Sequence, residues 1–397
     1  MPSLPEARKN PPVPEPVMPH LPALDGLRGV AILLVLVHML YLLETEDGLL
    51  AYIFYRISEF GWTGVQLFFV LSGFLITGIL LDTARARNYF SAFYARRVLR
   101  IFPLYFSVLA IAFILLPAIG IVPTTITFDQ PHQIWLWTYM SNWTHLFTES
   151  SKTFPHFWSL AVEEQFYLVW PLLIRSRSPE QCLCFCLGVA AVSLALRCLL
   201  VWTGIPGHFI YDNSFCRMDA LALGGAAAAA LRIPAYSAQL LAMHRRFLVW
   251  SGMIFLAGLV ITRGFWTGTL TGASIGYTIV AASFTLLLVA IVGAEASNSS
   301  GWIDIFRLRP LRMIGKYSYA IYIFHKPLHT FVGRPLVAAL KINISQSIFW
   351  SAAYIVIMTA ATFGLAWVSW RVLEKPFLDL KRFFTPSFPV RTSPGTS

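Results

Sequence analysis

Long runs of apolar residues follow one another along the chain, and short polar or basic segments separate them. A helix that crosses a bilayer needs about 20 consecutive, mostly apolar residues. Stretches near that length occur at 27–44, 61–81, 101–122, 157–174, 182–202, 216–231, 248–262, 271–293, 313–333 and 347–370. The pattern predicts an all-α, polytopic integral membrane protein with about ten transmembrane helices.

The composition agrees with apolar surroundings. Hydrophobic residues make up 57% of the chain and charged residues only 12%, and the mean hydropathy is +0.64. A soluble domain carries about a quarter charged residues. We therefore expect membrane lipids around most of the chain, which argues against an ordinary soluble protein.

The basic residues predict a topology. Cytoplasmic loops of membrane proteins are enriched in Lys and Arg. An N-terminus inside the cell makes all the basic segments cytoplasmic, at 85–100, 175–177, 232–246, 307–312 and from 371 onward. The acidic residues Glu44, Glu46 and Asp47 then lie outside. We expect a multi-pass protein of the cell membrane, in bacteria the inner membrane, with both termini cytoplasmic.

This topology requires that the aromatic stretch 133–143 stay at the interface, because a span there would reverse every later loop.

Although the net charge is +11, the basic residues form no single stripe, so no nucleic-acid partner is expected. The predicted organisation is a disordered cytoplasmic tail at 1–20, a membrane domain at 21–377 and a cytoplasmic tail at 378–397. No cleavable signal and no metal site are expected.

The first apolar run holds two candidate functional residues. Burying a titratable group in a bilayer is costly, so such groups mark functional sites. Arg28 lies at the start of the run and His38 ten residues later, about 15 Å along a helix. A buried imidazole can accept a proton from a hydroxyl near neutral pH. It can also hydrogen-bond a neighbouring helix as a packing group, and both interpretations of His38 stay open.

The segment ARRVLRIFP carries Arg97 and Arg100 three residues apart. Guanidinium groups suit phosphates, including those of a nucleotide-bearing donor. Contact with lipid headgroups is the alternative.

Later apolar runs carry further charged or titratable groups. Glu163 and Glu164 are adjacent, so they point about 100° apart on a helix and are not expected to act as a matched acid–base pair. One of them could orient a base or hold a polar acceptor. Arg217 and Asp219 are candidates for substrate contact, with mutual ion pairing as the alternative. His325 is a further candidate for substrate contact.

Seven motifs follow in a fixed order: LDGLRG with a later His, GVQLFFVLSGFLIT, ARRVLRIFP, FWSLAVEEQFYLVWP, RMDALALGG, IGKYSYAIYIFH and VLEKPF. From about Leu21 to Phe377 the chain resembles the acyltransferase 3 family of membrane-bound O-acyltransferases. The resemblance implies transfer of an acyl group, often acetyl, from acyl-CoA to a hydroxyl of a sugar or sugar-containing acceptor. Acyl-CoA would be a co-substrate, and no bound cofactor is implied.

The resemblance also implies roles for single residues. His38 resembles the catalytic histidine, Arg28 its companion, and Arg97 with Arg100 the RxxR pair that faces the donor. Glu163 matches the motif glutamate. The family's Arg and His are usually separated by ten residues, whereas nine lie between them here, which puts them about 80° apart on an ideal helix. Direct contact would need a local change such as a π-bulge.

The motifs leave a second class of function open. No nucleophile elbow, metal box or P-loop is present, which argues against hydrolase, zinc and NTPase chemistry. A multi-pass transporter or exporter is the alternative, since many spans with buried charges also describe one. Transporters of this kind often contain internal repeats, and no such repeat is evident between the two halves of this sequence. The acceptor remains open among polysaccharide, lipid-linked glycan, peptidoglycan, a Nod-factor-like oligosaccharide and a glycosylated or macrolide natural product.

Overall fold

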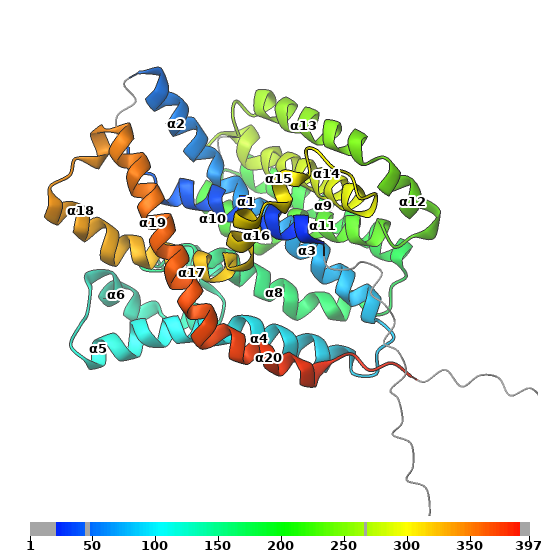
Figure 1. The fold of residues 1–397 in the computed structure, drawn as a ribbon, viewed down its shortest axis with the longest axis horizontal. Coiled ribbons are helices and arrows are strands. Elements are labelled where there is room, and N and C mark those ends of the chain that lie inside the picture. Colours follow the sequence, from blue (N-terminus) through cyan, green and yellow to red (C-terminus); the bar gives the residue numbers. More distant parts are fainter. Residues whose placement is uncertain (1–20, 44–47, 266–267, 390–397) are drawn as a thin grey trace, which may run out of the picture.

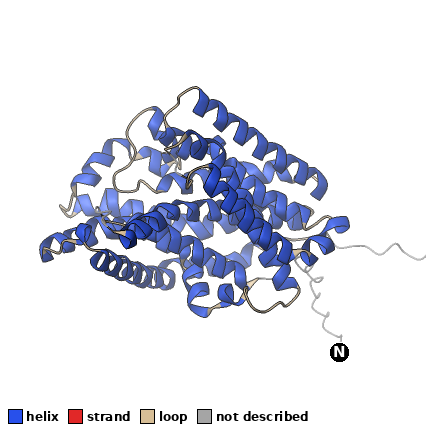
Figure 2. Ribbon diagram, turned by 90° about the horizontal axis from the view of Figure 1, so that it is seen from above, coloured by secondary structure: helices blue, strands red, loops and turns tan. Residues whose placement is uncertain are grey.

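The computed structural model describes residues 21–43, 48–265 and 268–389. Within these ranges the ordered elements are all helices, joined by loops and turns (Figure 2). The acidic loop 44–47 and the outer parts of both tails lie outside the described residues. The all-α prediction is confirmed for the described part of the chain.

Helical residues occupy every apolar stretch that the sequence predicted to span. The long helices are α1 (Pro22–Leu40), α3 (Thr63–Thr83), α4 (Tyr89–Ala110), α8 (Phe157–Ile174), α9 (Pro179–Trp202), α11 (Ser214–Ala230), α13 (His244–Ile261), α14 (Tyr277–Ala296), α17 (Ser318–Leu328) and α19 (Ile348–Ser369).

Shorter elements connect them. The α-helices are α2 (Leu49–Glu59), α5 (Leu116–Ala118), α6 (Thr124–Asp129), α7 (Ile134–Trp137), α10 (Gly207–Asp212), α12 (Pro234–Ala242), α15 (Asp304–Arg307), α16 (Arg309–Lys316), α18 (Arg334–Leu340) and α20 (Lys375–Asp379). The 3-10 and π turns are η1 (Phe60–Trp62), η2 (Ile111–Leu115), η3 (Gln130–His132), η4 (Ser141–Leu146), η5 (Gly272–Gly276), η6 (His329–Gly333), η7 (Ile344–Gln346), η8 (Trp370–Glu374) and η9 (Leu380–Phe384).

The number of spans differs from the predicted ten. By length and hydropathy, 7 helical segments of the described chain can cross a membrane, or 8 if the pair α10–α11 and α12, bent by 104°, is one span. Two predicted spans fall short for physical reasons. Residues 163–165 lower the hydropathy of α8, which is otherwise long enough, and His325, Lys326 and His329 do the same for the continuous helical run 318–340 formed by α17, η6 and α18. The chain is thus a multi-pass membrane protein whose full count of spans stays a prediction.

The aromatic stretch 133–143 folds into α7, of 4 residues, and part of η4. Neither element is long enough to cross a bilayer, because a helix rises about 1.5 Å per residue. This agrees with the prediction that the stretch does not span the membrane, and its position at the interface stays a prediction.

α1 packs directly against the α15–α16 pair through backbone. A Cβ built on Gly26 would lie 1.8 Å from the carbonyl oxygen of Phe306, and one on Gly315 would lie 1.8 Å from that of Asp25. Only glycine allows helices to approach this closely. The contact holds α1, which carries Arg28 and His38, against α15 and α16.

The C-terminal helices lie against α4 although they are far apart in sequence. Figure 1 shows α20 beside α4, with α19 crossing the molecule above them, and contacts join α4 to η8, α20 and η9. The last described part of the chain therefore borders the same region as the basic segment 96–100.

Candidate active site

A cavity of about 1060 Å³ lies between α1, α3, α4, α8, α16 and α17, and residues 370, 381 and 386 complete its wall. Its lining contains eight basic side chains, namely Arg28, Arg96, Arg97, Arg100, Arg309, Arg312, Lys316 and Lys381. Three carboxyl groups face them, those of Asp25, Glu163 and Glu164. Positive charges in a cleft with walls of low dielectric constant raise the local concentration of anions. The cavity is therefore suited to an anionic ligand.

The arginines on α4 lie on one side of that helix, because residues three and four apart are neighbours on a helix surface. The guanidinium of Arg97 packs on two rings, 5.6 Å from the centroid of Phe93 and 5.5 Å from that of Tyr167. Tyr319 from α17 donates a hydrogen bond to the Ile101 carbonyl at 2.8 Å. Contacts from α8 and α17 thus hold the basic segment of α4 at the cavity.

Glu163 is connected to α3 through Tyr167. The Tyr167 hydroxyl donates to Oε2 of Glu163 at 3.2 Å and is also hydrogen-bonded to the Ser72 hydroxyl. Both Glu163 and Glu164 line the cavity, although they point in different directions on α8. The cavity therefore covers more of the α8 surface than a single helical face.

α1 brings Arg28 to the cavity but not His38. Arg28 is near Asp25, with Nη1 3.5 Å from Oδ1. His38 is not among the lining residues. α1 is continuous α-helix from Pro22 to Leu40, with no π-turn, so Arg28 and His38 stay about 15 Å apart. The local change that would bring them into contact is not present.

The surroundings of His38 select one tautomer. Its Nδ1 is 2.9 Å from the backbone carbonyl oxygen of Ser58. A carbonyl can only accept, so Nδ1 carries the hydrogen, and in the neutral ring Nε2 keeps its lone pair. This is the tautomer in which Nε2 can accept a proton.

Arg217 and Asp219 are both fully buried, and neither lines the cavity. The two side chains do not form the mutual ion pair that was the alternative to substrate contact. Asp219 pairs with Arg197 of α9 at 2.9 Å. Arg217 packs among four aromatic rings, with its guanidinium 4.5 Å from the centroid of Tyr277 and 4.9 Å from that of Tyr211. These contacts are typical of interhelical packing.

His325 is buried just behind the cavity wall. Its Nδ1 donates to the Tyr322 carbonyl at 2.6 Å, and its ring lies 4.6 Å from that of His156. Tyr322 and Ser159 line the cavity, and their hydroxyl oxygens are 2.5 Å apart. His325 therefore supports the wall and does not reach the cavity itself.

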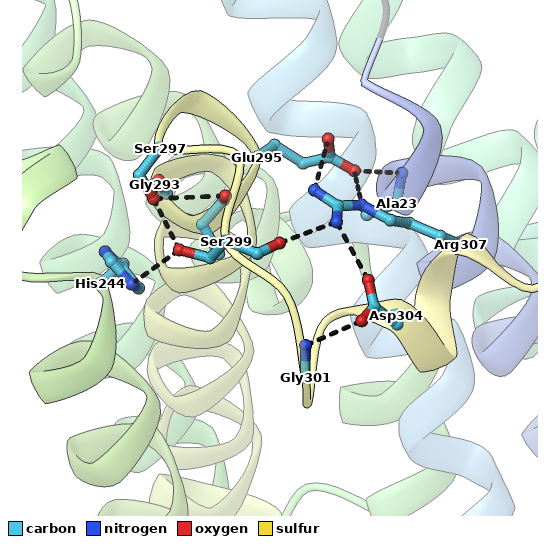
Figure 3. A network of polar contacts seen from close by, with 10 residues as sticks. Ala23, His244, Gly293, Glu295, Ser297, Ser299, Gly301, Asp304 and Arg307 are labelled. Atoms are coloured by element: carbon cyan, nitrogen blue, oxygen red, sulfur yellow. Dashed lines mark hydrogen bonds and ion pairs between the residues drawn. The ribbon is translucent and has the colours of Figure 1, made fainter.

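An ion-pair network positions α1 and α16 (Figure 3). The backbone N–H of Ala23 donates to Oε1 of Glu295 at 3.0 Å, which satisfies a free donor at the start of α1. Arg307 donates to both carboxylate oxygens of Glu295, each at 3.2 Å. The Gly301 N–H and Arg307 hold the pKa of Asp304 below its usual range. The network ties α14, α15 and α1 together where α16 begins.

Several lining residues carried no signal in the sequence. Ser72, Ser159 and Tyr167 lie inside the quoted motifs, but uncharged hydroxyl groups in an apolar run resemble ordinary helix contacts. Lys381 lies beyond the predicted membrane domain. Among the described residues, no group of three or more His, Cys, Asp or Glu side chains could hold a metal ion.

Comparison with known proteins shows the family. A profile described as "Acyltransferase domain" (Acyl_transf_3) matches residues 21–371. The chain is similar to "Peptidoglycan O-acetyltransferase OatA" of Listeria monocytogenes, with 27% identity over 373 residues that cover 90% of this chain and 56% of the relative. It is 26% identical to "Putative peptidoglycan O-acetyltransferase YrhL" of Bacillus subtilis over 392 residues, 90% of this chain and 55% of the relative.

"O-acetyltransferase OatA" of Staphylococcus aureus is 26% identical over 326 residues, 79% of this chain and 51% of the relative. The chain thus spans about half the length of these curated relatives. No solved structure matches. Because the profile covers most of the chain, in agreement with the order of the sequence motifs, the protein belongs to the acyltransferase 3 family.

Proposed function

We propose that the protein is a membrane O-acyltransferase that moves an acyl group, in the simplest case acetyl, from acyl-CoA to a hydroxyl of a carbohydrate. The cavity carries this proposal: eight basic side chains and three carboxyl groups line a space of about 1060 Å³. CoA is an anion with several phosphate groups, and guanidinium groups bind phosphate oxygens in bidentate geometry. The peptidoglycan O-acetyltransferases among the relatives support a sugar-containing acceptor.

In this proposal Arg97 and Arg100 hold the phosphates of the donor. The positive-inside pattern predicts that they and both termini lie on the cytoplasmic side, where acyl-CoA is available. The thioester end of the donor then extends along the cavity past Arg28 and Glu163. Cations along this path stabilise the anionic donor. Glu163, which accepts a hydrogen bond from Tyr167, would keep the polar wall in place.

The transfer step needs a base. The acceptor oxygen attacks the thioester carbonyl carbon, its proton passes to Nε2 of His38, and a tetrahedral oxyanion forms. The oxyanion collapses, the carbon–sulfur bond breaks and CoA leaves as thiolate, which takes up a proton. His38 does not line the cavity, so in this proposal the thioester must pass about 15 Å beyond Arg28, along α1, to meet the acceptor beside Nε2. The Ser58 carbonyl supports this role because it leaves Nε2 free of hydrogen.

Comparison of envelope glycans tests the proposal in cells. A deletion strain should lose a base-labile acetyl mass increment from one glycan, and the wild-type gene should restore it. A gene carrying Arg97→Ala, expressed at the same level, should restore little. If the deletion and wild-type strains had identical acyl content in all glycans, the proposed acyltransferase activity would be refuted. Accumulation of an unmodified glycan on the wrong side of the membrane would indicate the transporter instead.

A further inference from the structure

The C-terminal segment 380–387 is fastened to the start of α4. The backbone N–H of Arg87 donates to the Ser387 carbonyl at 2.8 Å. Asn88 donates from Nδ2 to the Thr385 carbonyl at 2.8 Å. Its Oδ1 accepts from the backbone N–H of Ser387 at 2.8 Å and from the Ser387 hydroxyl at 3.1 Å. Polar contacts from two consecutive residues therefore hold the segment beside the basic helix.

Two residues of this segment, Lys381 and Pro386, line the cavity. Lys381 lies within electrostatic reach of Arg96, Arg97 and Arg100, which all repel it. Among the described residues no carboxylate forms an ion pair with Lys381. Holding four cations close together is unfavourable unless an anion binds among them. The four hydrogen bonds of the segment thus hold Lys381 beside three arginines, where an anionic ligand would stabilise its charged form.

We propose that the C-terminal segment completes the donor site and that Lys381 binds a phosphate group of the donor. This inference rests on the proposed function. The thioester must reach the inner part of the cavity, so the phosphate-bearing end of the donor stays near the α4 arginines and Lys381. A lysine ammonium binds phosphate as a point charge and needs no fixed orientation. Lipid headgroups offer the same phosphate chemistry, so the experiment must separate the two sources.

The test uses the full chain in phosphatidylcholine nanodiscs, with CoA binding measured by calorimetry and turnover measured with acetyl-CoA. Lys381→Gln should raise the Kd for CoA and the KM for acetyl-CoA about tenfold, with kcat within about twofold of wild type. Arg382→Gln is the matched control. It removes the same charge from the next residue, which is exposed and does not line the cavity. Its donor affinity should equal that of the wild type.

Asn88→Ala tests whether the hydrogen bonds of Asn88 hold the C-terminal segment in place. Loss of its three hydrogen bonds should release the segment, raise the Kd for CoA, and speed tryptic cleavage after Lys381 and Arg382. Because Asn88 acts through Lys381, the double variant Asn88→Ala/Lys381→Gln should bind CoA no more weakly than Lys381→Gln alone. Additive losses would show that the segment does not position Lys381.

Three outcomes would overturn the inference. Equal CoA affinity in Lys381→Gln and wild type would remove Lys381 from the donor site. An effect of Lys381→Gln confined to lost stabilisation by added phosphatidylglycerol, with CoA binding unchanged, would assign the residue to a lipid headgroup. If the wild-type protein itself bound no CoA, the proposed function would fail and this inference with it, whereas the first two outcomes leave the proposed function intact.

Discussion

At the scale of single residues, His38 and the α4 arginines occupy different surroundings. His38 lies on α1, with Nδ1 bound to a backbone carbonyl, whereas Arg97 and Arg100 line the cavity with many other charges. The sequence predicted both as functional because charged or titratable groups are rare in apolar runs. It also predicted a separation of about 15 Å between Arg28 and His38, in agreement with the unbroken helix between them, but not that Arg28 lines the cavity while His38 does not.

His38→Gln separates chemistry from packing. Glutamine keeps hydrogen-bonding groups but cannot accept a proton at neutral pH. Loss of a positioned base typically costs a factor of about 10² to 10⁴ in rate, so we expect kcat to fall by that factor while expression and Tm stay near wild type. His38→Ala should lose the same activity. Turnover by His38→Gln near that of wild type would make His38 a packing residue.

Arg97→Ala and Arg100→Ala should each raise the KM for acyl-CoA about tenfold or more, since a hydrogen bond to a charged group contributes about 1.5–3 kcal/mol. Steady-state kinetics at varied donor concentration measures this. Arg245→Ala is the control, because that arginine lies in the first turn of α13 and does not line the cavity. Equal KM values in all three variants and the wild type would assign the α4 arginines to topology alone.

At the scale of elements, the helices match the apolar stretches because local hydropathy determines which segments leave water. The boundaries and breaks depend on other contacts. The polar residues in α8 are tolerated because the side chains of Glu163 and Glu164 line a cavity. The break between α16 and α17 at Tyr317 has no strong local signal. The sequence therefore predicted the positions of the helices better than the number of helices that span the membrane.

The close approach of α1 to α16 makes Gly315 sensitive to substitution. A Cβ there would lie 1.8 Å from the carbonyl oxygen of Asp25, so Gly315→Ala must push the helices apart. We expect a large loss of folded protein, measured as the monodisperse fraction after detergent extraction. Gly188→Ala in α9 is the control, since nothing lies within 4 Å of its Cβ. Equal yields of the two variants would contradict the packing of α1 on α16.

The network around Glu295 predicts a stability effect. Glu295→Gln removes the charge that binds Arg307 and the start of α1, and should lower the stability by about 1–3 kcal/mol, which thermal unfolding in detergent would detect. Asp304→Asn should cost less, because Asp304 is 53% exposed and surface pairs contribute little. A smaller loss for Glu295→Gln than for Asp304→Asn would contradict the importance of the link to α1.

At the scale of the whole molecule, the motifs predicted much of the cavity wall. Arg28, Arg97, Arg100, Glu163 and Glu164 come from three helices that are separated in sequence and meet around one space. The basic residues of α16 and the C-terminal segment also line it, but only tertiary packing brings them there. Patterns along one chain indicate which residues are unusual, whereas the arrangement of the helices decides which of them share a site.

The most direct test of the central claim follows the acyl group itself. Purified protein in nanodiscs is mixed with acetyl-CoA labelled in the acetyl group and with soluble peptidoglycan fragments, and label in the glycan and free CoA thiol are measured together. We expect label to enter the glycan as a base-labile ester, with one thiol released for each acetyl transferred, and both signals to disappear in His38→Gln. Absence of thiol release and of labelled glycan from the wild-type protein, in samples that bind CoA, would contradict the account.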